Sequence, residues 1–104
     1  MGDLTIDHRF TMPKDDARAR LQALGEYLQN KHGLSVSWSG DTANVSGRYL
    51  VVSIEGRLTV SDGVATFSGK DPGFLWRGKA KDYLAYKLKT YLDPAKTLEQ
   101  LQRR

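Results

Sequence analysis

The sequence predicts an α+β fold: an antiparallel sheet of four to five strands with two amphipathic helices on one face. Several short segments alternate apolar and polar residues, as strands with one buried face do. Two longer segments repeat apolar residues every three or four positions, which is typical of helices. Helices packed on one side of an antiparallel sheet bury all of these apolar stripes. The expected order is β-α-β-β-β-β-α plus a short C-terminal helix.

The first strand and the first helix follow each other directly. Leu4, Ile6, His8 and Phe10 alternate with polar residues, which predicts a half-buried strand. Pro13 suits the first helical position, and two aspartates follow it where the helix dipole favours negative charge. The helix then carries one apolar stripe and ends at Gly33 as its C-cap. The stripe consists of Ala17, Leu21, Leu24 and Leu28.

The middle of the chain predicts three strands. Leu34, Val36 and Trp38 alternate with serines, and residues 39–42 form a turn. A weaker strand is expected from Ala43 to Ser46. The strongest alternation comes next, with Gly56 at a position where the strand can bend or bulge. Its apolar members are Leu50, Val52, Ile54, Leu58 and Val60.

A tight hairpin is expected after this strand. Asp62-Gly63 is a residue pair favoured in type I′ turns, and a two-residue loop there pairs Val60 with Ala65 and Leu58 with Phe67. Residues 70–73 then end the sheet.

The second helix has an apolar stripe and an opposite polar face. The stripe is Ala80, Leu84, Leu88 and Tyr91, and the polar face is Lys79, Asp82, Tyr86 and Lys89. Asp93-Pro94 has the pattern of an N-cap followed by a first-turn proline, which predicts a short terminal helix with Leu98 and Leu101.

Length and composition indicate one domain, residues 1–104, with a core over 3–92 and a helical C-terminal extension over 93–104. A chain of 104 residues with 39% hydrophobic residues buries enough surface for one modest core. It contains no cysteine, and its acidic start lacks the features of a signal peptide, so we expect a cytoplasmic protein. No apolar stretch approaches the length that spans a bilayer.

Charge is uneven along the chain. Residues 1–69 contain seven Lys/Arg and eight Asp/Glu, whereas residues 70–104 contain nine and four. A basic C-terminal third can attract nucleic acid, an anionic surface or an acidic protein, but a solvated helix face is the more common reason for such a charge.

The motifs associated with catalysis or metal binding are absent or incomplete. Residues 73–80 approach the phosphate-binding loop pattern, but Ala80 stands where Ser or Thr must supply a hydroxyl. His8 and His32 have no ligand partners at metal-binding spacing. Asp15 and Asp16 are adjacent and point about 100° apart on a helix, so they cannot form a carboxylate pair. We therefore predict no enzymatic activity, no catalytic residues, no metal and no cofactor.

One segment combines aromatic and basic residues. Between Phe74 and Tyr91, five aromatic residues are interspersed with five Lys or Arg residues. This combination can bind single-stranded nucleic acid by stacking, or place a helix at an apolar–aqueous boundary, although aromatics at helical spacing are more often core. The candidate contact residues are Phe74, Trp76, Arg77, Lys79 and Lys81.

Three segments resemble the polyhydroxyalkanoic acid system proteins. They are residues 34–41 (LSVSWSGD), residues 56–60 (GRLTV) and residues 74–79 (FLWRGK), and the resemblance covers residues 3 to about 93. These are short bacterial proteins whose genes neighbour those for making polyester storage granules. The resemblance implies a granule-associated or regulatory role and carries over no catalytic residue.

The leading hypothesis is therefore a non-enzymatic accessory protein that contacts polyester granules or their proteins. A second is a carrier that holds a fatty acyl or hydroxyacyl ligand between the sheet and the last helix, at residues that also fit a solid core. A third, less favoured, is nucleic-acid binding through the basic third. An exposed edge strand makes a homodimer compatible with the sequence.

Overall fold

The computed structural model describes residues 4–49 and 52–103, and it confirms the α+β fold and the predicted order of elements. Its elements are β1 (Leu4–Arg9), α1 (Lys14–His32), β2 (Ser35–Ser39), β3 (Thr42–Tyr49), β4 (Val52–Ser61), β5 (Val64–Gly69), α2 (Phe74–Tyr91) and a 3₁₀ turn, η1 (Leu98–Gln100).

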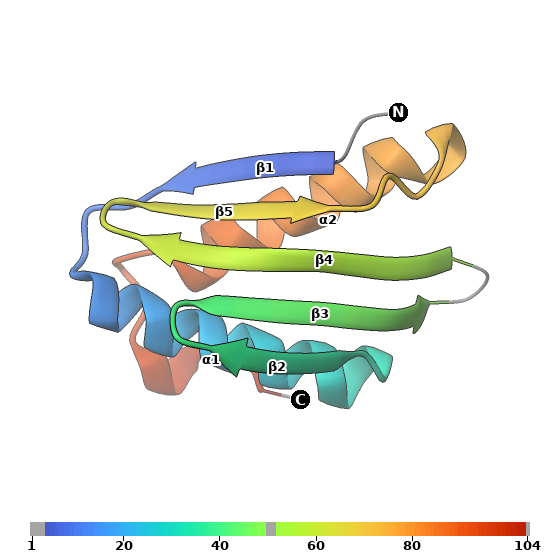
Figure 1. Cartoon of the computed structure of the whole chain (residues 1–104). Helices are drawn as coiled ribbons and strands as arrows, with labels where there is room; N and C mark the ends of the chain where they lie inside the picture. Colours follow the sequence, from blue (N-terminus) through green and yellow to red (C-terminus); the bar gives the residue numbers. More distant parts are fainter. Residues whose placement is uncertain (1–3, 50–51, 104) are drawn as a thin grey trace.

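The five strands form one antiparallel sheet in the order β1-β5-β4-β3-β2, so β1 and β2 are its edges. Both helices lie behind the same face (Figure 1). Helix α1 packs against β2 and β4, whereas α2 packs against β1. The opposite face carries the polar half of each alternating strand, and no described helix covers it.

The core lies between the sheet and the helices. The predicted α1 stripe of Ala17, Leu21, Leu24 and Leu28 is buried, and Tyr27 is buried beside it. Leu58, Val60, Ala65 and Phe67 contribute from the inner face of the sheet, and Leu88 and Tyr91 from α2. Among the described residues no polar or charged side chain is buried. The core therefore consists of the apolar faces of the strands and the apolar stripes of the helices.

Helix α1 ends as the sequence predicts. Gly33 adopts a left-handed conformation (φ 71°), and its N–H donates to the carbonyl of Gln29. At the other end the helix begins at Lys14, so Pro13 is its N-cap and not its first helical residue.

The β4–β5 hairpin has the predicted register, with Val60 opposite Ala65 and Leu58 opposite Phe67. Gly56 does not mark a bulge, because pairing to β3 continues through it without interruption and it pairs in register with Gly69 of β5. The glycine has a packing role. A Cβ at this position would lie 2.4 Å from Cζ of Phe67, so only a hydrogen leaves room for the ring.

Strand β3 is longer than predicted. It runs from Thr42 to Tyr49, where Ala43 and Val45 are buried but Ala43 and Gly47 are too small to give a strong apolar signal. Strand β4 begins at Val52, and the predicted strand residue Leu50 lies outside the described residues.

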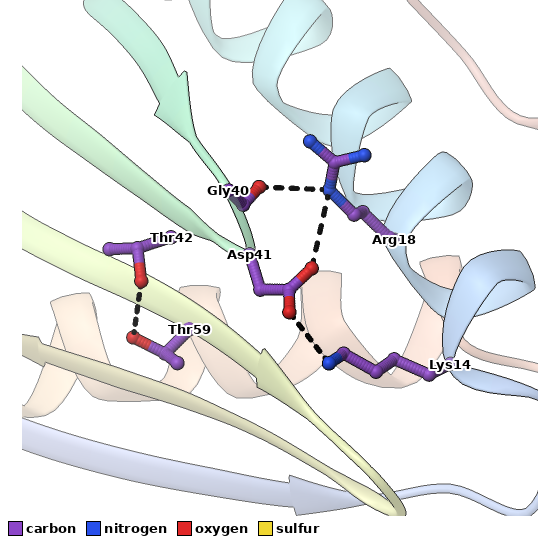
Figure 2. A network of polar contacts seen from close by, with 6 residues as sticks. All are labelled: Lys14, Arg18, Gly40, Asp41, Thr42 and Thr59. Atoms are coloured by element: carbon purple, nitrogen blue, oxygen red, sulfur yellow. Dashed lines mark hydrogen bonds and ion pairs between the residues drawn. The ribbon is translucent and has the colours of Figure 1, made fainter.

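Ion pairs connect the β2–β3 turn to the start of α1 (Figure 2). The carboxylate of Asp41 lies 2.6 Å from Nζ of Lys14 and 3.7 Å from Nε of Arg18, which also donates to the Gly40 carbonyl. The bond to Lys14 lowers the pKa of Asp41 and raises that of Lys14. The Arg18 guanidinium also lies over the ring of Trp38.

The C-terminal segment packs on α1, and it contains a 3₁₀ turn in place of the predicted helix from Asp93. The Asp93 side chain accepts from the N–H of Ala95, which forms a local turn, and the 3₁₀ turn begins only after Thr97. Leu101 is buried, and the Arg20 guanidinium donates to the carbonyls of Tyr91, Asp93 and Lys96.

Candidate interaction surface

The start of α2 is organised by one aspartate. The Asp71 carboxylate accepts from the backbone N–H of Gly73 at 2.8 Å and pairs with the Arg77 guanidinium at 2.6 Å. These contacts, that with Arg77 first, hold the pKa of Asp71 below its usual value. Asp71 therefore fixes the direction in which α2 leaves the sheet.

The five predicted contact residues do not form one cluster. Arg77 is engaged by Asp71, and successive residues of a helix turn by about 100°, so Lys79 points to nearly the opposite side from Arg77. Lys79 and Lys81 are exposed, and Nζ of Lys79 lies 5.7 Å from the centre of the half-buried Trp76 ring. The Phe74 side chain lies outside the described part of the structure.

Among the described side chains of α2, the two most exposed apolar ones are not among the five contact residues predicted from the sequence. Leu75 is 72% exposed and Tyr86 is 63% exposed. They are eleven positions apart, which is three helical turns, so both point to the same side. We call this side the α2 outer face and define it as Leu75, Lys79, Asp82, Tyr86 and Lys89, all of which are exposed.

A helical projection of the sequence identifies part of this face. The predicted polar face already held Lys79, Asp82, Tyr86 and Lys89. It did not include Leu75, because an apolar residue in a helix is normally assigned to the core. The exposure of Leu75 depends on how the two helices are placed. Helix α1 ends at His32, beside Tyr83, so the first turns of α2 extend past the end of α1.

An aromatic and basic cluster joins the two helices. The hydroxyl of Tyr83 lies 2.9 Å from Nε2 of His32. Nζ of Lys87 lies 4.2 Å from the centre of the Tyr27 ring, in cation–π contact. Burial and the nearby charges of Lys31 and Lys87 lower the pKa of His32. These surroundings favour the neutral form of His32.

A shallow groove of about 240 Å³ lies between α1 and β2. Val36 and Trp38 form its apolar side. Glu26, the acidic group on its rim, pairs with Arg103. The groove therefore combines a small apolar surface with a carboxylate that already has a partner.

Groups suited to chemistry are dispersed. Within residues 4–49 and 52–103 no three His, Cys, Asp or Glu side chains lie close enough to hold a metal ion. Residues 74–80, which resembled a phosphate-binding loop, form the first two turns of α2 and follow an antiparallel sheet. Burial raises the pKa of Tyr91 to about 12, and its hydroxyl donates to the Gln102 carbonyl, so it has a structural role.

Comparison with known proteins indicates the biological setting of this chain. Residues 4–95 match the family described as "putative polyhydroxyalkanoic acid system protein". The chain belongs to this family. The polyhydroxyalkanoic acid system match ends in the C-terminal segment, before η1. Searches of curated proteins and of solved structures found no match. None of the described helices is both long enough and apolar enough to cross a bilayer.

Proposed function

We propose that this chain is a non-enzymatic accessory protein of polyhydroxyalkanoate granule metabolism, and that α2 makes its contact with the granule surface or with a protein on it. The family membership supports the setting. The observation that carries the contact is the α2 outer face, where Leu75 and Tyr86 are both more than half exposed in a small domain whose other large apolar side chains are mostly buried.

The chemistry of this face fits an apolar surface with an anionic boundary. Leu75 and Tyr86 can enter an apolar layer, while Lys79 and Lys89 remain at the aqueous side. Of the residues selected from the sequence, Lys79 and Lys81 are available for contact, and we propose that Trp76, which is half-buried, extends the same surface. For Phe74 the contact remains a prediction from the sequence. Arg77 contributes by holding Asp71.

The test is co-sedimentation with purified polyester granules at low and high salt. We expect the protein to bind with little loss at high salt, because apolar contact is not screened. Replacing both Leu75 and Tyr86 by Ser is expected to weaken binding by about tenfold or more, since each buries an apolar side chain on contact.

Two controls make this result specific. A variant with Ser37 and Ser53 replaced by Ala alters two exposed positions on the sheet and should bind as the parent does. An unrelated basic protein measures non-specific attraction. Binding no stronger than that of the basic protein would remove the granule contact from the proposal. Equal binding of the Leu75 and Tyr86 variant would assign the contact to another surface.

A carrier function is the second candidate, because two apolar residues between the sheet and α2 are only partly buried. Ile54 on β4 and Leu84 on α2 both pack against the edge of the core. A hydroxyacyl chain could complete that packing. Native mass spectrometry of the purified protein should then detect a retained ligand, whereas a single mass equal to that of the chain argues for a solid core.

Nucleic-acid binding makes a different prediction from either of these. An interaction through Lys79, Lys81, Lys87 and Lys89 would weaken steeply as salt rises, because counterions are released on binding. Binding to a single-stranded oligonucleotide that is stronger than granule binding, and strongly salt-dependent, would favour this alternative.

A further inference from the structure

Strand β1 has backbone groups that lack a partner strand. It is the first strand of the sheet and pairs only with β5. Just beyond it, the N–H of Phe10 donates to the carbonyl of Gly63, so the even-numbered residues of this segment face β5. The N–H and C=O groups of Thr5, Asp7 and Arg9 therefore point away from the sheet. Residues 4–49 and 52–103 provide no hydrogen bond to these groups.

The opposite edge of the sheet differs. In β2 the outward N–H of Val36 donates to Oε1 of Gln29 at 3.0 Å, so a side chain of α1 occupies a position that an added strand would need. Covering an edge in this way prevents strand addition. The contrast identifies β1 as the edge that can accept another strand.

The charges of β1 are complementary to those of β1 in a second copy. Asp7 and Arg9 are both exposed on the outer face of the sheet. When two β1 strands run antiparallel about a twofold axis through His8, Asp7 of each copy lies opposite Arg9 of the partner subunit. Both residues carry outward backbone groups, so this register forms hydrogen bonds and two cross-strand ion pairs together.

Helix α2 does not obstruct this arrangement. Tyr83 and Lys87 mark the side of α2 that faces α1. The opposite side carries Gly78 and Ala85, both exposed and small. This side lies over β1, because Lys89 is close enough to His8 to lower the pKa of that histidine, after burial. Lys81 and Lys89 flank these two small residues, and both have exposed, flexible side chains that can turn toward solvent as a second copy approaches.

We propose that the protein forms a homodimer by antiparallel pairing of β1 with β1 of a second copy, in the register that places Asp7 opposite Arg9 of the partner subunit. The two five-stranded sheets become one continuous sheet. Both α2 outer faces then lie on the same side of the assembly, where two copies of one weak contact reinforce each other. The dimer does not depend on what α2 binds.

Analytical ultracentrifugation of the parent and of charge variants tests this pairing. The parent should sediment with twice the 11.7 kDa mass of the chain. Asp7→Arg and Arg9→Asp each place like charges opposite each other at two positions, so each should raise the dissociation constant about tenfold or more. The double variant Asp7→Arg/Arg9→Asp restores opposite charges and should dimerise as the parent does.

The matched control is Arg57→Asp, which makes the same change of charge on the outer face of β4, an interior strand. It should leave the mass of the parent unchanged. Circular dichroism of every variant separates loss of the dimer from loss of the fold. A parent that stays monomeric at the highest concentration reached overturns the proposal, and so does a dimer that tolerates both single reversals.

Amide hydrogen exchange supplies an independent measurement. In a dimer the amides of Asp7 and Arg9 should exchange more slowly as concentration rises, whereas those of Ile6 and His8 are already bonded to β5 and should not change. Asp7 and Arg9 amides that exchange at the same rate at all concentrations would contradict pairing at this edge.

Discussion

Single side chains decide how closely the strands of this sheet can pack. At Gly56 the Phe67 ring occupies the space of a Cβ, and the Cα of Gly69 lies on the same side. At Gly78, on exposed α2, nothing lies within 4 Å of the corresponding position. Packing therefore requires a glycine at position 56 and leaves room for a larger residue at position 78.

We expect Gly56→Ala to lower the free energy of unfolding by about 1–3 kcal/mol, because Phe67 must leave its position to admit the methyl group. Gly78→Ala is the matched control and should raise it by about 0.5–1 kcal/mol, because alanine favours the helix. Urea unfolding followed by circular dichroism measures both. A Gly56→Ala protein as stable as the parent would show that the ring moves without cost.

Among the elements, local sequence signals determine the register of the β4–β5 hairpin, whereas neighbouring strands determine the length of β3. The Asp62-Gly63 turn and the alternation beside it specify the β4–β5 register without reference to the rest of the chain. In β3 the alternation is weak because Ala43 and Gly47 offer little apolar surface between the polar residues, and the strand extends to Tyr49 because β2 and β4 supply partners on both sides.

The candidate surface was predicted only in part for a similar reason. Sequence order places Phe74, Trp76, Arg77, Lys79 and Lys81 together, but helical rotation distributes them around α2. Neither the ion pair of Arg77 with Asp71 nor the exposure of Leu75 follows from the spacing of residues. Both depend on where α2 lies relative to the sheet and to the end of α1.

The C-terminal segment has a larger structural role than an appended extension. Leu101 is buried, and Asn30 donates to the carbonyl of Arg103. We expect Leu101→Ala to reduce the free energy of unfolding by about 2–3 kcal/mol through loss of buried surface and creation of a cavity. Gln102→Ala, at an exposed side chain, should change it by less than about 0.5 kcal/mol. Equal stabilities of the two variants would mean that the segment is only loosely attached.

For the whole molecule, stability should fall as the solution is acidified, in two steps. The pKa values of His8 and His32 are lowered in the fold, chiefly by burial. The unfolded chain therefore binds protons more readily below about pH 6.5, and stability is lost as the pH falls from there through the lowered pKa values. The lowered pKa values of Asp41 and Asp71 produce a second loss below about pH 4.

Urea unfolding across this pH range measures both steps. Replacing His8 and His32 by Gln should remove the step below neutral pH and leave the acidic one, because the Asp41 and Asp71 ion pairs remain. A stability that is constant between roughly pH 7 and pH 5 in the parent would contradict the inferred surroundings of the two histidines.

The contacts between α1 and the last described residues also set the order in which the chain can fold during synthesis. Arg20, Glu26 and Asn30 meet partners more than seventy positions later. The apolar stripe of α1 is made early, but Leu98 and Leu101 can join it only after residues 33–97 have been made. Until residues 98–103 emerge from the ribosome, a nascent chain exposes part of this stripe, and exposed apolar surface of this kind is what chaperones protect.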